Sequence, residues 1–393
     1  MRKLLILGAS RLQLPCIIKA KAMGLFVGVV DMNSEATGVR LADIFFECST
    51  NDTNKILQFA DEFKPDGVMT LATDMPMRSV AAVAEKYNLS AISYDVAIKA
   101  TDKVEMIKCF KAHNVPHPWF EIVHSVDELN VAVADKHTPY IMKPNDSSGS
   151  RGVILVTNKS ESVSAFNYSL SYSKSGAVLV EEYMTGPEVS VEIIVCEEVV
   201  HVLAITDKLT TGSPYFVEMG HSQPSQLSEE TIKSIKKVAV EAVKAIGINN
   251  SPAHVEIIVT DTGPKLVELG ARLGGDNITG SLVPLSTGIN MVEACIKLAL
   301  GEIPDLNMKC KKGAAIRYFQ TGKGLFKGVD GVDKAMNNSY VKELIVEKQI
   351  GDEIHEIKSS GDRIGFVITQ ATDAKQAITE CEKAINMLKF HIE

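Results

Sequence analysis

The sequence lacks the signatures of several common protein classes. Its seven cysteines form no CxxC pair and no zinc-ligand spacing, which favours free thiols in a reducing compartment. No apolar stretch is long enough to span a bilayer. The short apolar run at the N-terminus leads directly into Gly8-Ala9-Ser10-Arg11, so it predicts a first β-strand rather than a signal peptide. These absences predict a cytoplasmic protein with no membrane partner.

The charge pattern excludes a further class of partner. The chain has 41 Lys and Arg residues against 49 Asp and Glu residues, a formal net charge of −8, without long runs of one sign. Non-specific nucleic-acid binding needs a basic patch, so no nucleic-acid partner is expected. The chain also has neither a GxGxxG fingerprint nor the Gly-Lys-Ser/Thr of a P-loop, which argues against nicotinamide binding and a P-loop site.

The chain is long and apolar enough to form several lobes. At 393 residues and 45% apolar content, two or three lobes are expected. Residues 1–100 alternate strand and helix patterns, ending in a short strand at 91–93, which predicts βαβ units and a parallel sheet. A helix capped by Thr101 or Asp102 opens a compact second part at 101–185. From 186 onward, apolar alternation predicts antiparallel strands. The predicted fold class is therefore mixed, α/β followed by α+β.

One predicted hairpin poses an electrostatic problem. The stretch "SPAHVEIIVTDTGPKLVELGARLGGD" carries one glutamate in each of two apolar strands, Glu256 and Glu268. A three-residue loop at 261–263 pairs Thr260 with Pro264 and sets the two glutamates opposite one another, where like charges destabilise a sheet. A divalent cation such as Mg²⁺ would reverse that effect. A two-residue loop would place them on opposite faces, and two solvated glutamates remain the alternative.

Residues near this hairpin are suited to binding phosphate. Arg272 shares a strand face with Glu268 and can stabilise charge on a transferred phosphoryl group, although a purely structural Arg–Glu pair is the alternative. The pair Gly274-Gly275 allows a backbone to approach a ligand closely. Lys143 is the one charge in the apolar strand "YIMKP" and needs an anionic partner. Lys103 opens a helix against its dipole, which makes sense if it reaches an external anion; a surface lysine is the alternative for each.

Taken in order, these motifs resemble the ATP-grasp superfamily, and most closely its carboxylate–amine ligases, including the L-amino acid ligases. The resemblance covers nearly the whole chain. It implies an ATP-grasp fold with an N-terminal Rossmann-like (pre-ATP-grasp) domain at 1–100, a small lid subdomain with its lead-in helix at 101–185, and a central domain with a C-terminal lobe at 186–393. Nucleotide binding is implied for Lys103, Lys143, Ser147, Ser148, Glu181, Glu182, Tyr183, Met184 and Glu188.

The same resemblance implies the chemistry. Glu256 and Glu268 would hold one or two Mg²⁺ ions, with Mn²⁺ as an alternative, and Arg272 and Lys208 would be catalytic. In "TDKLTTGSPYFVEMGHSQPS" the loop of amino acid ligases is implied, with Lys208 near the phosphates and a substrate set of Glu218, His221, Asp74, Gly274 and Gly275. The alternative is a mobile surface loop with incidental charges. One departure is Gly270, where the family often places a metal-binding asparagine.

The implied reaction joins a small-molecule carboxylate to an amine with ATP, through an acyl phosphate, with release of ADP and phosphate. The product is an amide or a peptide, such as one formed from two L-amino acids. Two other readings stay open: an enzyme acting through carboxyphosphate, similar to biotin carboxylase or carboxyaminoimidazole ribonucleotide synthetase, and a nucleotide-binding module without catalysis. A homodimer is common in similar enzymes.

Overall fold

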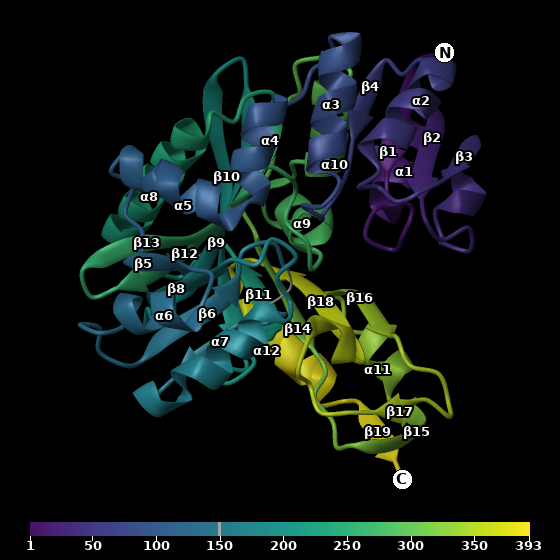
Figure 1. Cartoon of the computed structure of the whole chain (residues 1–393). Helices are drawn as coiled ribbons and strands as arrows, with labels where there is room; N and C mark the ends of the chain where they lie inside the picture. The colour runs from purple at the N-terminus through teal and green to yellow at the C-terminus, as the bar shows by residue number, and fades with distance from the viewer. Residues whose placement is uncertain (148–150) are drawn as a thin grey trace.

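The computed structural model describes residues 1–147 and 151–393, and Figure 1 shows their arrangement. The N-terminal domain is a four-stranded parallel sheet in the order β3-β2-β1-β4. Its side chains from Leu5, Leu7 and Val30 pack against Phe59 and Phe63 of a flanking helix. The domain comprises β1 (Lys3–Leu7), α1 (Leu14–Ala22), β2 (Phe26–Asp31), η1 (Val39–Leu41), β3 (Ile44–Glu47), α2 (Thr53–Phe63), β4 (Gly67–Met69) and α3 (Met77–Tyr87).

The short strand predicted at 91–93 is wrong. Ser93 instead begins α4 (Tyr94–Thr101), because its hydroxyl accepts a hydrogen bond from the Val96 amide at 3.3 Å. A second helix, α5 (Lys103–Ala112), follows directly and is capped by Asp102, whose carboxylate accepts from the amides of Val104 and Glu105. The predicted cap at this point is confirmed, and it fixes Lys103 at the first position of the helix.

A small subdomain follows, built on an antiparallel sheet in the order β5-β8-β6-β7. Its core contains Tyr140, Met142, Phe166 and Val180, all fully or almost fully buried. The subdomain comprises β5 (Phe120–Val123), α6 (Val126–Ala132), β6 (Tyr140–Pro144), β7 (Ile154–Val156), η2 (Lys159–Glu161), α7 (Ser162–Leu170) and β8 (Val178–Glu182).

The central domain and C-terminal lobe share one eight-stranded sheet, in the order β13-β12-β9-β10-β11-β14-β18-β16. The lobe is joined to the central domain through β11–β14 pairing, in which Gly220 faces Arg317. The sheet comprises β9 (Glu188–Cys196), β10 (Val199–Thr210), β11 (Glu218–Gln223), β12 (Ser251–Thr260), β13 (Gly263–Gly270), β14 (Gly313–Tyr318), β16 (Val341–Val346) and β18 (Gly365–Ala371).

Helices pack against this eight-stranded sheet, and the C-terminal lobe also contains a three-stranded sheet in the order β17-β15-β19 (Figure 1). Apolar residues of α8, including Val238 and Val243, pack beneath β9 and β12, whereas those of α10, including Met291 and Cys295, pack toward the N-terminal domain. These elements are α8 (Glu229–Ile246), η3 (Ile278–Leu282), α9 (Val283–Thr287), α10 (Met291–Ala299), β15 (Gly324–Asp330), α11 (Val332–Met336), β17 (Glu353–Ile354), η4 (Ser360–Asp362), α12 (Ala374–Ile385) and β19 (Lys389–Ile392).

Two further predictions concern the cysteines and the membrane. All seven cysteines are free, as predicted, and burial raises the pKa of the Cys16 thiol to about 12. Within residues 1–147 and 151–393, no single helix is long and apolar enough to cross a membrane. One bent pair, 278–287 with 291–299, passes that test jointly at an angle of 113°.

Candidate active site

The hairpin of β12 and β13 brings two carboxylates together. Glu256 pairs directly with Glu268, as predicted. The loop, however, is one residue shorter than predicted, since Thr260 pairs with Gly263 rather than Pro264. A β-bulge restores the register: Ile257 pairs with Leu266, so Val267 is the extra residue. Bulges re-aim side chains in this way, and here the bulge sets both glutamates on one face despite the short loop.

Two lysines neutralise these glutamates. The Lys208 ammonium lies 3.1 Å from Glu256, 2.6 Å from Glu188 and 3.5 Å from Glu218, and its side chain is only 3% exposed. Burial opposes its charge, but Glu256 and Glu188 raise the pKa of Lys208 well above the usual value. The Lys103 ammonium lies 3.2 Å from Glu268. Each of the paired carboxylates is thus held by a cation that a metal ion could displace.

A buried histidine supports Glu256 from the other side. His254 Nε2 lies 3.3 Å from Glu256, and its Nδ1 lies 3.0 Å from Glu192, a carboxylate with no exposed surface. Ser190 donates to the same Glu192 at 2.7 Å. Burial alone would lower the pKa of His254, but Glu192 raises it to about 9. Burial raises the pKa of Glu256, whereas Lys208 and His254 outweigh it and hold that pKa well below its usual range.

Glu192 and His254 were not predicted as site residues, although the sequence carries a signal for both. His254 stands two residues before Glu256 in one strand, so both share a face. Glu192 is the charged residue in the apolar run "VSVEIIV", and it pairs with His254 across β9 and β12. Gly274 lies directly against this pair, since a Cβ atom there would be 2.6 Å from His254 Nδ1. Gly274 therefore packs against the His254–Glu192 pair, while a Cβ atom at Gly275 would meet only Ala72.

Arg272 binds an aspartate of the N-terminal domain. Its Nε and a terminal nitrogen lie 2.9 and 3.1 Å from the two carboxylate oxygens of Asp74. Burial opposes the charge, but Asp74 raises the pKa of Arg272. The predicted substrate residue Asp74 is thus paired with the predicted catalytic residue. Gly270 is explained by this pair, because a Cβ atom there would lie 2.7 Å from the Asp74 carboxylate. A side chain at that position would displace the Asp74–Arg272 pair, so glycine there leaves the pair in place and supplies no metal ligand.

Most of the predicted nucleotide residues lie on the two central strands of the small sheet, β6 and β8, or directly after them. Lys143 lies 2.7 Å from Glu181, and both are buried, whereas Glu181 Oε1 has no hydrogen-bond partner in the described chain. Glu182 turns away and pairs with Lys265 at 2.8 Å. The carbonyl of Ser147 accepts from Lys103 at 2.9 Å. The Tyr183 ring lies 6.2 Å from the Phe216 ring, and Met184 follows it in the hinge after β8. Ser148 lies outside the described residues.

The stretch predicted as a substrate loop is largely a pair of strands. β10 runs to Thr210 and β11 begins at Glu218. A bulge at Met219 pairs Lys208 with His221 and Thr210 with Glu218, so both predicted residues lie on the Lys208 face although they are three apart. His221 is buried and its Nδ1 has no hydrogen-bond partner among the described residues. These residues are therefore fixed by the sheet rather than carried on a mobile loop.

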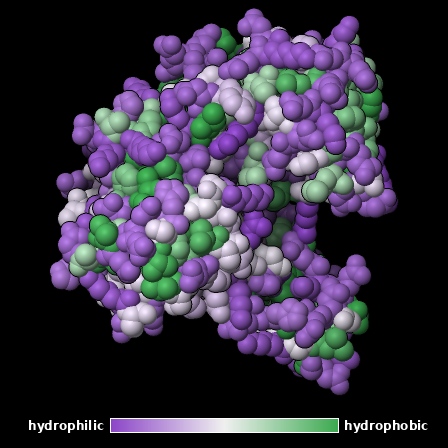
Figure 2. Space-filling model, viewed as in Figure 1, coloured by the Kyte–Doolittle hydropathy of each residue, from purple (hydrophilic) through white to green (hydrophobic). Residues whose placement is uncertain are grey.

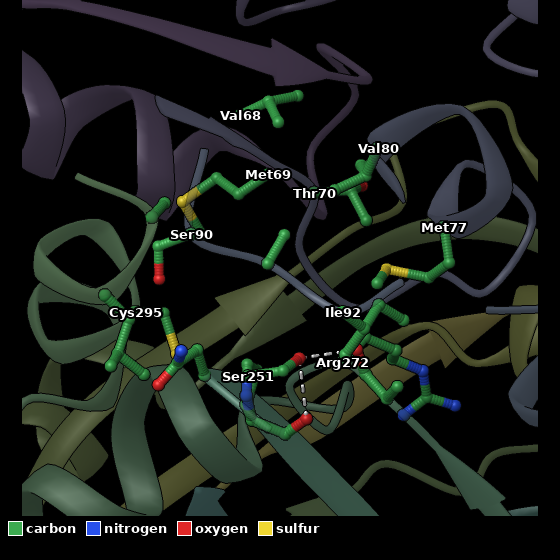
Figure 3. Close-up of a pocket in the computed structure, with 16 residues that line it drawn as sticks. Val68, Met69, Thr70, Met77, Val80, Ser90, Ile92, Ser251, Arg272 and Cys295 are labelled. Atoms are coloured by element: carbon green, nitrogen blue, oxygen red, sulfur yellow. Dashed lines mark hydrogen bonds between the residues drawn. The ribbon is translucent and has the colours of Figure 1, made fainter. Parts of the chain in front are cut away.

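The shape of the molecule is consistent with an open site. Figure 2 shows a hollow between the N-terminal domain and the C-terminal lobe, with hydrophilic residues around it. A separate cavity of about 40 Å³ lies behind Arg272 and is lined mostly by apolar residues, including Met69, Met77 and Cys295. In Figure 3 the guanidinium of Arg272 points away from Cys295 and Ser90. That cavity has room for only a few water molecules, so it is too small to hold a nucleotide or an amino acid.

The donor set fits Mg²⁺ bound with its nucleotide. The described residues contain no group of three or more His, Cys, Asp or Glu side chains arranged to hold a metal by themselves. Mg²⁺ commonly takes only one or two carboxylates, with waters and substrate phosphates completing its shell. Glu256 and Glu268 supply two facing carboxylates, and Lys103 and Lys208 supply cations beside them.

A prediction concerns His254, which acts through Glu256 rather than on substrate. Residues that orient a metal ligand typically contribute 10- to 100-fold to metal affinity. We expect His254→Gln to raise the Mg²⁺ concentration for half-maximal activity about 10- to 100-fold, because a neutral amide lacks the positive charge that His254 holds between Glu192 and Glu256. Magnesium titrations of ATP turnover would measure it.

The control for that variant is His391→Gln, since His391 forms a similar but exposed pair with Asp330 at 2.8 Å. This control should leave the magnesium titration unchanged. A His254→Gln variant with a lower maximal rate but the wild-type magnesium midpoint would contradict the positioning role.

Comparison with known proteins shows which families this chain resembles. Residues 136–280 match a family model described as an ATP-grasp domain, and residues 302–393 match one described as L-amino acid ligase C-terminal domain 2. The alanine–anticapsin ligase of Bacillus subtilis is 27% identical over 276 residues, which cover 64% of this chain and 58% of that protein.

Solved structures extend the likeness to the whole chain. The L-amino acid ligase from Bacillus licheniformis gives a TM-score of 0.87 at 22% identity, covering 100% of this chain and 99% of the other. A phosphoribosylglycinamide synthetase from Anaerococcus prevotii gives 0.82 at 25% identity, covering 100% of both chains. The predicted fold class is confirmed.

Proposed function

This chain joins an ATP-grasp domain to an L-amino acid ligase C-terminal domain, and we propose that it is an ADP-forming carboxylate–amine ligase acting on amino acids. The observation that carries the proposal is the facing pair Glu256 and Glu268, each matched to a lysine, with Arg272 two residues beyond the end of β13. Two carboxylates beside several cations suit a metal-bound triphosphate better than a neutral ligand.

In the proposed reaction, a substrate carboxylate oxygen attacks the γ-phosphorus of ATP. The bond to the β-phosphate oxygen breaks and ADP leaves. An amine nitrogen then attacks the acyl carbon of the acyl phosphate; the carbon–oxygen bond breaks, phosphate leaves, and the nitrogen loses a proton to solvent. Bound Mg²⁺ would neutralise phosphate charge. The chain itself contributes mainly positioning and electrostatic stabilisation.

The residues fall into roles that their contacts support. Lys103 and Lys143 would bind phosphate oxygens, since each is paired with a carboxylate that a nucleotide can replace. Glu181 would accept from the adenine amino group through its unpartnered oxygen. Glu188 would bind the ribose hydroxyls, and Arg272 would stabilise developing charge on the phosphoryl group. Tyr183 and Met184 would contact the ring edge from the hinge.

The domain division supports the same function. We assign 1–100 as the pre-ATP-grasp domain, 101–185 as the lid subdomain with its lead-in helix, and 186–393 as the central domain with the C-terminal lobe. Acyl phosphates hydrolyse in water. The lid would therefore close over the facing glutamates, Glu256 and Glu268, and their lysine partners during turnover.

The experiment is ATP-dependent phosphate release across single and paired L-amino acids, with separate arms for bicarbonate and for glycine with phosphoribosylamine. Mass spectrometry identifies the products. Release that needs two amino acids and yields a condensed product is expected. Release with bicarbonate alone would overturn the proposal in favour of carboxyphosphate chemistry. Bound ATP with no turnover in any arm would favour the non-catalytic reading.

A further inference from the structure

The C-terminal lobe brings a further ion pair into this site. Arg363 binds both carboxylate oxygens of Asp276 at 2.8 Å. The Arg363 guanidinium also stacks on the Tyr318 ring, 3.7 Å from its centroid. His221 Nε2 lies 3.5 Å from the same aspartate. None of Asp276, Tyr318 and Arg363 has a role in the reaction proposed above, although they adjoin the predicted substrate residues Glu218 and His221.

The two partners of this pair differ in what they can still bind. Arg363 donates to Asp276, to the Glu218 carbonyl at 3.1 Å and to the Ser360 carbonyl at 3.0 Å. The Tyr318 ring covers one face of its guanidinium group. Its side chain is 10% exposed, against 25% for Asp276. Asp276 Oδ1 accepts one hydrogen bond, from Arg363, and a carboxylate oxygen can accept two. The group open to a ligand is therefore the carboxylate.

The carboxylate is also kept charged. Burial opposes ionisation, but hydrogen bonds from Arg363 and His221 hold the pKa of Asp276 below its usual range. The Glu218 carboxylate adds negative potential nearby, and its cation, Lys208, is shared with Glu188 and Glu256. This end of the site therefore carries two carboxylates, Asp276 and Glu218, that can accept hydrogen bonds from a cationic group.

The backbone at this position is one that few residues other than glycine, asparagine and aspartate adopt. Asp276 and Asn277 both have left-handed backbones, with φ of 50° and 60°. Such conformations cost about 1–3 kcal/mol at functional sites. Glycine would adopt them without strain, and glycines already stand at 274 and 275. The strain at Asp276 is offset by the bidentate contact with Arg363.

We propose that Asp276, oriented by Arg363 and His221, binds a cationic nitrogen of the amino-acid substrate. The inference rests on the proposed ligase function and narrows its substrate class. The nitrogen is either the α-ammonium group or a basic side chain; both present the same N–H donors and charge to the carboxylate. The C-terminal lobe thereby completes the substrate site.

The test measures KM for amino acids in Asp276→Asn and in the double variant Asp276→Asn/Arg363→Met. The double variant leaves no charge unpaired and so guards against loss of folding. We expect KM to rise about tenfold or more in both variants, the effect of one lost charged hydrogen bond, while KM for ATP stays unchanged. Asp330→Asn is the control, because Asp330 is an exposed aspartate of the C-terminal lobe, which also carries Arg363.

KM values for L-alanine, L-lysine and L-glutamate identify which substrate nitrogen Asp276 binds. A rise for L-alanine and L-lysine alike supports the α-ammonium contact, and a rise for L-lysine alone supports a side-chain contact. An unchanged KM for every amino acid would overturn the inference, as would a lower KM for L-glutamate alone.

A separate measurement on wild type distinguishes the two proposals: thermal stabilisation by L-alanine or L-lysine without ATP. Wild-type turnover with unaltered KM in the variants refutes only the Asp276 assignment. Wild type without amino-acid turnover refutes the ligase proposal, and loss of thermal stabilisation by these amino acids in Asp276→Asn then still supports the cation subsite.

Discussion

Glu256→Gln is expected to lower ATP-dependent phosphate release about 1000-fold, equivalent to roughly 4 kcal/mol of transition-state stabilisation. The substitution keeps the shape of the side chain but removes the charge that faces Glu268. Lys208 would still contact Glu188 and Glu218, so the buried ammonium keeps partners and the fold should persist. Phosphate release measured against Mg²⁺ concentration, with circular dichroism to verify folding, tests the prediction.

The matched control is Glu35→Gln, since Glu35 is 77% exposed and paired only with Arg40 at 3.3 Å. It should behave as wild type. Nucleotide binding separates the causes of a loss: Glu256→Gln should still bind ATP without metal but should gain little affinity when Mg²⁺ is added. A variant that turns over normally would show that the carboxylate pair is a structural feature of the hairpin.

Local patterns predicted much of this site because its residues lie in regular strands and helices. The alternation of β12 and β13 sufficed to pair Glu256 with Glu268. Two deviations from the prediction cancel here. The loop is one residue shorter than predicted, and the bulge at Val267 restores the predicted pairing of the two glutamates. A bulge depends on contacts across the sheet, so no count of residues along one hairpin reveals it.

Contacts between distant segments could not be predicted in the same way. His254 meets Glu192 across 62 positions, and Arg363 meets Asp276 across 87. Each arises from the order of strands in the large sheet, which continues from β11 into β14. The chain pattern indicated antiparallel strands after residue 186 without their order. The C-terminal lobe therefore had no assigned role until its strands were placed beside β11.

Gly270 shows how one departure from a family pattern acquires a physical cause. The sequence alone indicated a missing metal ligand. In the structure, a Cβ atom at this position would lie 2.7 Å from Asp74 and 3.0 Å from Arg272 Cζ. The glycine thus makes room for a bidentate ion pair between the N-terminal domain and the end of β13. We expect the pair, rather than a third protein ligand, to shape this side of the site.

Arg272→Met separates the catalytic role of that arginine from its structural one. Removing a positioned donor that stabilises transition-state charge should lower kcat about 100- to 1000-fold. The same change leaves Asp74 unpaired, and its side chain is only 19% exposed. Breaking a buried pair from one side costs about 3 kcal/mol, which should lower Tm on the order of 5 °C.

A double-mutant cycle with Asp74→Asn resolves the two effects. The double variant carries no unpaired charge, so it should recover most of the lost Tm, because both partners of the ion pair are gone. Its kcat should stay as low as in Arg272→Met, because no guanidinium is present to act on the phosphoryl group. Recovery of kcat together with Tm would mean that Arg272 serves only to join the N-terminal domain to β13. Calorimetry and phosphate release on the same four proteins decide between the two.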